Sequence, residues 1–222
     1  MKHILSAWGI KGFNPLIALF LCSVLSCKTI PEPIGELPSK AVEEEETLSE
    51  TQEKVVEGAN WALGRTTLNV NGRIFNLDCS GTVMAVYYYA GIDLSRDFGK
   101  YSGGGTSRIY QYLDDKKLLY NTLNPVPGDI IFWDNTFDSN GDGIRNDYLT
   151  HMGIVVEVSE LGTITYLHEH YKKGIILETM NLVIPDDLEE NSAMRMRGTG
   201  MEGGWLASHL YRESAMGYKL EE

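Results

Sequence analysis

The sequence Leu77-Asp78-Cys79-Ser80-Gly81 leads into an apolar run, residues 82–90, that closes at Gly91. Aspartate and serine are residue types that cap helix N-termini, and a glycine often follows the last turn of a helix. The pattern therefore predicts a helix over this run, with Cys79 in its first turn. Free backbone N–H groups and the positive end of the helix dipole favour an anion there, so we expect the Cys79 thiol to ionise more easily than a free cysteine.

Cys79 taken alone is weak evidence for catalysis, because an isolated cysteine is about as often a small buried apolar residue. The two other cysteines, Cys22 and Cys27, both lie near the start of the sequence. If Cys22 is removed with a signal and Cys27 is modified, Cys79 is left as a single thiol that can form no internal disulfide. A lone thiol in an oxidising compartment is a liability unless it has a task, which favours a functional role.

The start of the chain has the layout of a secretory signal. Basic side chains precede an apolar stretch, residues 16–25, that is too short for a transmembrane helix. The sequence Val24-Leu25-Ser26-Cys27 resembles the lipobox of bacterial lipoproteins. This resemblance implies that residues 1–26 are a signal peptide and that Cys27 is lipidated, with plain secretion or an uncleaved anchor as the alternatives.

Residues 27–50 have the composition of a tether that follows the lipidated N-terminus. They contain several prolines, a run of four glutamates and few large apolar residues, so they cannot bury enough surface to fold and should be disordered. The remaining residues, 51–222, are apolar enough to form one domain. Because the formal net charge of the 222 residues is −12, a polyanionic partner such as nucleic acid is not expected.

After the tether, helical patterns come first and strand patterns follow, an order typical of an α+β protein. Asn71-Gly72 predicts a tight hairpin turn, and the glycines at residues 103–105 indicate a flexible loop. We expect helices at residues 49–63, 79–90, 107–119 and 205–211. We expect strands at residues 69–75 (a hairpin), 130–133, 152–158, 163–168 and 174–180. Residues 94–107 and 185–204 should be irregular.

Two histidines stand at strand ends downstream of Cys79. His151 directly precedes the strand at residues 152–158, and His168 ends the strand that follows it. A thiol at a helix N-terminus, a histidine base and a third group that orients this histidine make up the site of thiol hydrolases. A histidine at a strand end is more often structural when it stands alone, so the prediction depends on the three residues together.

Four motifs, taken in chain order, resemble those of the NlpC family of papain-like cell-wall cysteine peptidases, and the related CHAP amidases share part of the pattern: Asp78-Cys79-Ser80-Gly81, Pro127-Gly128-Asp129-Ile130-Ile131-Phe132-Trp133, His151-Met152-Gly153-Ile154-Val155 and Tyr166-Leu167-His168. The resemblance runs from about residue 53 to residue 181. It implies a papain-like α+β fold, with N-terminal helices packed on a small antiparallel sheet and residues 51–222 as the peptidase domain.

The resemblance also implies a role for each residue of the site. Cys79 would attack an amide carbonyl, its backbone N–H would stabilise the oxyanion, and His151 would keep the thiol ionised and then protonate the leaving amine. His168 would hydrogen-bond the far nitrogen of His151 and fix its tautomer, with His170 on the same strand face as the alternative. This catalysis requires no cofactor. Residues 67–75 depart from the family pattern, in which an aromatic residue and glycines shape the substrate cleft.

The connection between Trp133 and His151 is longer than two strands need, and it contains a calcium-loop pattern. Oxygen-bearing side chains at alternate positions followed by glycine match the first half of an EF-hand loop. The expected ligands of a structural calcium ion are Asp138, Asn140, Asp142 and the carbonyl of Ile144. Leu149 stands where the loop needs its bidentate glutamate, so a polar turn without calcium is an equal alternative.

The sequence therefore predicts a cysteine hydrolase that cleaves amide bonds in peptidoglycan stem peptides, as an endopeptidase or amidase. We expect a monomer that is held in the bacterial cell envelope by the lipid on Cys27. The expected partners are the stem peptides and the membrane that holds the lipid. A non-catalytic envelope lipoprotein that binds wall peptides in the same cleft is the alternative, and an acyltransferase on the same fold is a third hypothesis.

Overall fold

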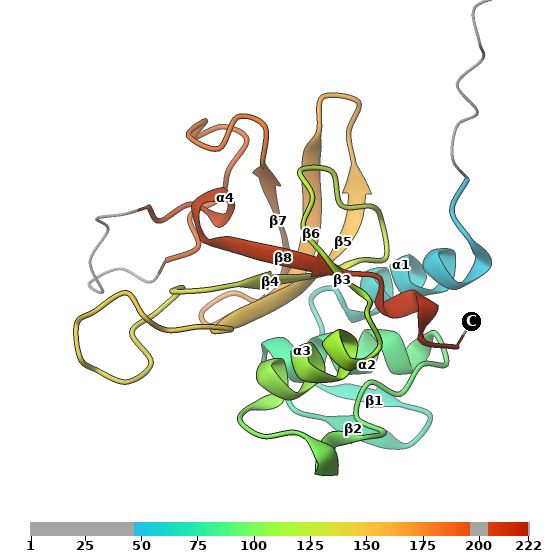
Figure 1. Cartoon of the computed structure of the whole chain (residues 1–222). Helices are drawn as coiled ribbons and strands as arrows, with labels where there is room; N and C mark the ends of the chain where they lie inside the picture. Colours follow the sequence, from blue (N-terminus) through green and yellow to red (C-terminus); the bar gives the residue numbers. More distant parts are fainter. Residues whose placement is uncertain (1–46, 196–203, 222) are drawn as a thin grey trace, which may run out of the picture. The chain divides into compact units, whose positions relative to one another are not determined.

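Helices on one side and a six-stranded antiparallel sheet on the other make up the fold of this chain (Figure 1). The computed structural model describes residues 47–195 and 204–221, which belong to one unit spanning Glu45–Glu222. The predicted signal peptide, the predicted lipidation site at Cys27 and most of the predicted tether lie outside the described residues. Among the described helices, none is long and apolar enough to cross a membrane.

Three helices come before most of the sheet, as the sequence predicts: α1 (Glu50–Ala62), α2 (Cys79–Tyr89) and α3 (Gly105–Asp115). α1 begins with a capping box, in which Ser49 Oγ accepts from the Gln52 N–H (3.3 Å) and Gln52 Oε1 accepts from the Ser49 N–H (3.0 Å). Gly58 allows α1 to pack closely on α2, because it has no side chain. A Cβ at this position would lie only 2.9 Å from the Val86 carbonyl oxygen. The α2 helix is thereby held against the rest of the helical layer.

A short hairpin connects α1 to α2. Its strands are β1 (Leu68–Val70) and β2 (Arg73–Phe75), which pair antiparallel. At the turn, Asn71 has φ 51° and Gly72 has φ 85°. Positive φ at both central residues is the signature of a type I′ turn, whose twist matches the twist of the two strands. The predicted hairpin and its turn are therefore confirmed.

The large sheet has the strand order β3-β8-β4-β5-β6-β7, with antiparallel pairing between each pair of neighbours. The strands are β3 (Leu119–Tyr120), β4 (Ile130–Trp133), β5 (His151–Val158), β6 (Thr163–His170), β7 (Gly174–Asn181) and β8 (Tyr211–Ala215). Short helical turns lie outside the sheet, at η1 (Phe98–Lys100), α4 (Ala207–Leu210) and η2 (Gly217–Glu221). This architecture confirms the α+β class and the helices packed on an antiparallel sheet.

β4 is buried on both faces, which explains why its sequence is a continuous apolar run. Ile130 and Phe132 belong to the core between the sheet and the helices. Ile131 and Trp133 belong to a second core on the other face, where Leu210 of α4 also packs. Because all four β4 side chains are fully buried, a strand with alternating polar residues would not fit here.

Two predicted helices have other bounds in the structure, and the strands β3 and β8 were not predicted. The helix predicted at residues 107–119 runs from Gly105 to Asp115, and the last residue of that range, Leu119, instead begins β3. The closing helix predicted at residues 205–211 is reduced to the four residues of α4, and β8, which was not predicted, follows at once. β8 pairs with β3 and β4, which lie far from it in the sequence, and its Arg-Glu-Ser segment has no strand-like pattern.

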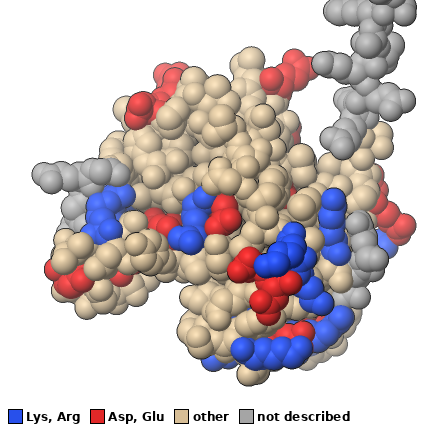
Figure 2. Space-filling view, in the orientation of Figure 1, with Lys and Arg blue, Asp and Glu red and all other residues tan. Residues whose placement is uncertain are grey.

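Charged side chains of both signs are mixed on the face of the molecule in Figure 2. Among the ion pairs of the described residues, the Arg212 guanidinium lies 2.8 Å from Asp134 and 3.4 Å from Glu213. On that face, the described residues form no broad basic surface of the kind that a polyanion requires.

Candidate active site

Cys79 is the first residue of α2, and the residues on either side of it hold the helix start in place. The Asp78 side chain accepts hydrogen bonds from the Gly81 N–H (2.7 Å) and from the Ser80 hydroxyl (2.9 Å). Gly81 must lack a side chain, because a Cβ there would lie 2.1 Å from the Asn76 carbonyl oxygen. The Asp-Cys-Ser-Gly motif is therefore a local structure that presents the thiol at a capped helix N-terminus.

We predict that Gly81→Ala lowers the free energy of unfolding by at least about 2 kcal/mol, because the added methyl group meets a backbone carbonyl that cannot move freely. Urea unfolding followed by circular dichroism measures this change. Gly99→Ala is the matched control, since a Cβ at Gly99 meets no atom within 4 Å. Equal stability of the two variants would contradict this account of the motif.

The N-terminus of α3 also reaches Cys79. Gly105, the first residue of α3, lies so close to α2 that a Cβ there would be 2.2 Å from Ser80 Oγ. The next residue, Thr106, places its hydroxyl oxygen 3.7 Å from Cys79 Sγ. Gly105 therefore allows the two helix starts to meet at the thiol. Thr106 is a site residue that the sequence prediction missed.

The two predicted histidines lie side by side on neighbouring strands. His151 is the first residue of β5, and His168 is near the end of β6. His151 Nε2 and His168 Nδ1 are 2.8 Å apart, with the rings perpendicular. The Trp133 ring contacts His151 at a centroid distance of 5.8 Å, so the imidazole is held between two rings.

Cys79, His151 and His168 line the same cavity, which has a volume of about 410 Å³. The structure thus brings together the three residues that the sequence singled out as catalytic. In the described part of the chain, the hydrogen-bonding side chain next to Sγ is Thr106, and no hydrogen bond joins Sγ to His151. The thiol and the imidazole therefore face one cavity without being paired.

Burial makes both reacting groups prefer their neutral forms. Burial raises the pKa of the Cys79 thiol, against the opposing effect of the Thr106 hydroxyl and nearby backbone N–H groups. Burial lowers the pKa of His151 to about 3, and repulsion from His168 and His170 acts in the same direction. The expectation that the helix start alone would ionise the thiol is therefore not met, because desolvation outweighs it.

Behind His168 lies a carboxylate that the sequence prediction also missed. Glu178 of β7 places Oε2 3.1 Å from His168 Nε2 and Oε1 3.0 Å from Lys173 Nζ. Burial alone would raise the pKa of Glu178, but the hydrogen bonds from His168 and Lys173 outweigh burial, so the pKa is lowered. Glu178 lies directly opposite Tyr166 on the neighbouring strand and diagonal to His168. Diagonal neighbours of this kind can be identified only when the register of the two strands is known, which the sequence does not give.

The other histidines have different surroundings. His170 Nδ1 accepts from the backbone N–H groups of Lys172 and Lys173, at 3.1 and 3.3 Å, and its ring stacks on Tyr171. His170 lines the cavity, but His168 is the histidine that contacts His151. His209 lies elsewhere, with Nε2 2.9 Å from Asp186 Oδ1.

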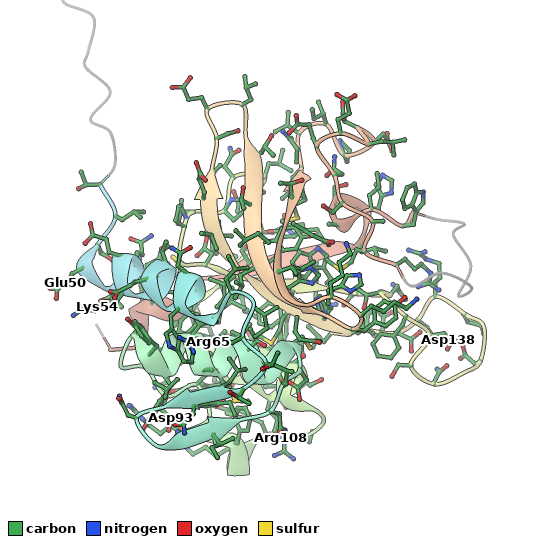
Figure 3. All side chains as sticks on the ribbon, turned by 180° about the vertical axis from the view of Figure 1, so that it is seen from behind. Glu50, Lys54, Arg65, Asp93, Arg108 and Asp138 are labelled. Atoms are coloured by element: carbon green, nitrogen blue, oxygen red, sulfur yellow. The ribbon has the colours of Figure 1, made fainter. Side chains whose placement is uncertain are left out.

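The acidic loop leads from β4 to His151, and Figure 3 shows Asp138 on a loop that projects from the sheet. Its carboxylates accept hydrogen bonds from the loop itself: Asp138 from the N–H groups of Gly141 (2.7 Å) and Gly143 (2.9 Å), and Asp142 from that of Ile144 (2.7 Å). Across residues 47–195 and 204–221, no three His, Cys, Asp or Glu side chains gather as metal ligands. Calcium binding by Asp138, Asn140, Asp142 and the Ile144 carbonyl stays a prediction.

We predict that millimolar calcium raises the midpoint of thermal unfolding if this loop is an ion site. A site without its bidentate glutamate should have a dissociation constant on the order of 10⁻⁴ to 10⁻³ M. Ion at about 100 times that constant would add roughly 2.7 kcal/mol to the free energy of unfolding. The measurement compares calcium with chelator for the wild type and for Asp142→Ala. An equal rise in both proteins, or none in the wild type, would leave the loop as a polar turn.

No protein-family model matches the chain, and no curated protein matches it. Among solved structures, the chain is similar to a protein from Staphylococcus aureus described as similar to a lipoprotein of the NLP/P60 family, with 21% sequence identity and a TM-score of 0.31. That similarity covers 61% of this chain and 39% of the Staphylococcus protein.

Proposed function

We propose that this chain is a cysteine hydrolase that cleaves amide bonds in peptidoglycan stem peptides. The observation that carries the proposal is the cavity in which Cys79, at the start of α2, faces the hydrogen-bonded pair His151 and His168. A nucleophile, a base and a group that orients the base are the parts that thiol hydrolysis needs. The order of the four motifs along the chain supports peptidoglycan as the substrate class.

The first half of the reaction is acylation. His151 takes the Cys79 proton as Sγ attacks the amide carbonyl, so a C–S bond forms while the oxyanion lies near the Cys79 backbone N–H. His151 then gives the proton to the nitrogen of the leaving amine, and the C–N bond breaks. Because the resting thiol and imidazole are both neutral, proton transfer accompanies the attack.

The second half returns the enzyme to its starting state. A water molecule gives a proton to His151 and attacks the thioester carbonyl, so that a C–O bond forms and the C–S bond breaks. His151 returns the proton to the Cys79 sulfur. One water is consumed, and one carboxyl group and one amine are released for each bond cut.

The cavity wall is suited to a peptide with mixed chemistry. Phe137, Tyr171 and Met194 supply apolar surface, whereas Glu169 is a carboxyl group on the same wall. Burial raises the pKa of Glu169, and the charge of Asp78 acts in the same direction. A cavity of about 410 Å³ holds a few residues of a peptide. The predicted lipid on Cys27 would place this cavity at the envelope, where the substrate is.

A digest of purified peptidoglycan tests the proposal. The soluble fragments are separated by chromatography after incubation with the wild type or with Cys79→Ser, and new amino groups are counted. We expect new fragments and new amines from the wild type alone. Identical fragment profiles for the two proteins would overturn the proposal.

One observation favours a second candidate function, that of an envelope lipoprotein that binds wall peptides without cutting them. In the described structure, Cys79 Sγ has Thr106 as its hydrogen-bonding side chain, and burial raises the pKa of the thiol. A pure binding protein should sediment with insoluble peptidoglycan, and Cys79→Ser should sediment equally well. Release of amines by the wild type would exclude this candidate.

A further inference from the structure

A continuous line of hydrogen bonds leads from His151 away from the cavity. His151 Nε2 lies 2.8 Å from His168 Nδ1, and His168 Nε2 lies 3.1 Å from Glu178 Oε2. The side chains of His168 and Glu178 are 2% and 11% exposed, so water does not compete freely for these contacts. Glu178 is absent from the cavity wall, so its hydrogen-bond contact with the site runs through His168.

The chemistry of these groups sets the direction of each hydrogen bond. An ionised carboxylate can only accept, so His168 Nε2 must carry the hydrogen. A neutral His168 then has its lone pair on Nδ1, where it must accept from His151. His151 therefore carries its hydrogen on Nε2, and its lone pair is on Nδ1, the nitrogen that does not face His168.

We propose that Glu178 is a positioning residue that orders the protons along His168 and His151 so that His151 keeps Nδ1 free to take the Cys79 proton. The inference rests on the proposed function, because it assigns His151 as the base. It concerns a residue on β7 that does not line the cavity.

If the Glu178 carboxylate is removed, the hydrogens on His168 and His151 can move to the opposite ring nitrogens. His168 can then hold its hydrogen on Nδ1 and donate to His151 Nε2, which moves the His151 hydrogen to Nδ1. In that tautomer His151 offers a donor where the reaction needs a base. The other charged or titratable groups around His168 include Tyr166, Glu169 and His170 on its own strand and Lys173 in the turn. None of them is a hydrogen-bond partner of Nε2.

Lys173 allows a sharper set of variants. In the wild type, Glu178 gives one oxygen to His168 and the other to Lys173. In Glu178→Gln, a single amide oxygen faces both donors, whereas adding Lys173→Met removes the competing donor. The double variant should therefore restore the acceptor for His168 without restoring the charge.

The experiment measures the second-order rate of Cys79 alkylation by iodoacetamide, which needs no wall substrate. Glu178→Leu should be slower than the wild type by about 10- to 100-fold, taken from the range for loss of a group that orients a metal-ligating histidine. Glu178→Gln should be intermediate, and Glu178→Gln/Lys173→Met should recover most of the lost rate. Glu157→Leu, at an exposed position of β5, is the control for loss of a carboxylate and should react like the wild type.

A spectroscopic readout checks the tautomer itself. Long-range proton–nitrogen NMR of the imidazole rings should show the His151 hydrogen on Nε2 in the wild type and in the double variant, and on Nδ1 or on both nitrogens in Glu178→Leu. Unchanged alkylation and an unchanged tautomer in Glu178→Leu would overturn the inference and leave the proposed function standing. If His151→Ala alkylates as fast as the wild type, the proposed function itself fails.

Discussion

Replacement of His151 by alanine is expected to slow both alkylation of Cys79 and release of amines from peptidoglycan by about 10³-fold. Burial raises the pKa of the thiol, so little thiolate forms near neutral pH unless a base receives the proton. His151 lines the same cavity as Cys79 and is the base that the proposal assigns. Because burial lowers its pKa to about 3, it is neutral throughout the physiological range, which is the form that can take up the thiol proton.

The pH dependence of the alkylation rate gives this prediction a second measurement. In His151→Ala, the rate should follow thiolate formation and rise tenfold per pH unit up to the raised pKa of Cys79. In the wild type, it should rise less steeply, because His151 supplies the base at each pH. His209→Ala is the matched control, since His209 pairs with Asp186 and lies off the cavity wall. Parallel pH profiles for wild type and His151→Ala would contradict the assignment of the base.

Trp133→Ala should cause the largest loss of stability, about 4 kcal/mol of unfolding free energy. The Trp133 side chain is fully buried, and its ring packs on Tyr166 at a centroid distance of 4.9 Å. Its indole N–H donates to the Ala207 carbonyl at 2.9 Å, and this carbonyl would lose its partner in the variant. For a domain of this size, the unfolding midpoint should fall by about 10 °C, at roughly 2–4 °C per kcal/mol.

Thermal unfolding followed by near-UV circular dichroism measures this loss. Trp61→Ala is the control, because the Trp61 side chain is only half-buried and stacks on Tyr89 at 5.6 Å. We expect Trp61→Ala to cost about 1 kcal/mol, the scale of one aromatic contact with partial burial. If the two variants are equally stable, Trp133 is not the centre of the second core.

The parts of the fold that the sequence predicted well are those with local causes. The α2 helix follows from the aspartate cap at Asp78 and the glycine at Gly91, and both signals lie within two residues of the helix ends. β4 follows from four consecutive large apolar residues, Ile130–Trp133, which no solvent-facing element could carry. The hairpin turn at Asn71-Gly72 follows from the backbone angles that these two residues accept.

The parts that the sequence did not predict depend on contacts between distant residues. β8 is a strand because β3 and β4 leave room between them, and its own residues give no such signal. Glu178 and Thr106 reach the site through strand register and helix packing, neither of which appears in a local pattern. The raised pKa of Cys79 has the same origin, because desolvation depends on everything that covers the thiol.

The position of β8 has a consequence for how the molecule folds. β4 is synthesised long before β8, so one edge of β4 has no strand partner until the chain has grown through residue 215. The Leu210 carbonyl that receives the Asp134 N–H at 3.0 Å, and the Ala207 carbonyl that receives the Trp133 indole, arrive equally late. Pairings of such long sequence separation form slowly, and an open apolar edge is prone to aggregation in the meantime. Trp133, whose ring contacts His151, should therefore be among the last side chains of the site to become ordered.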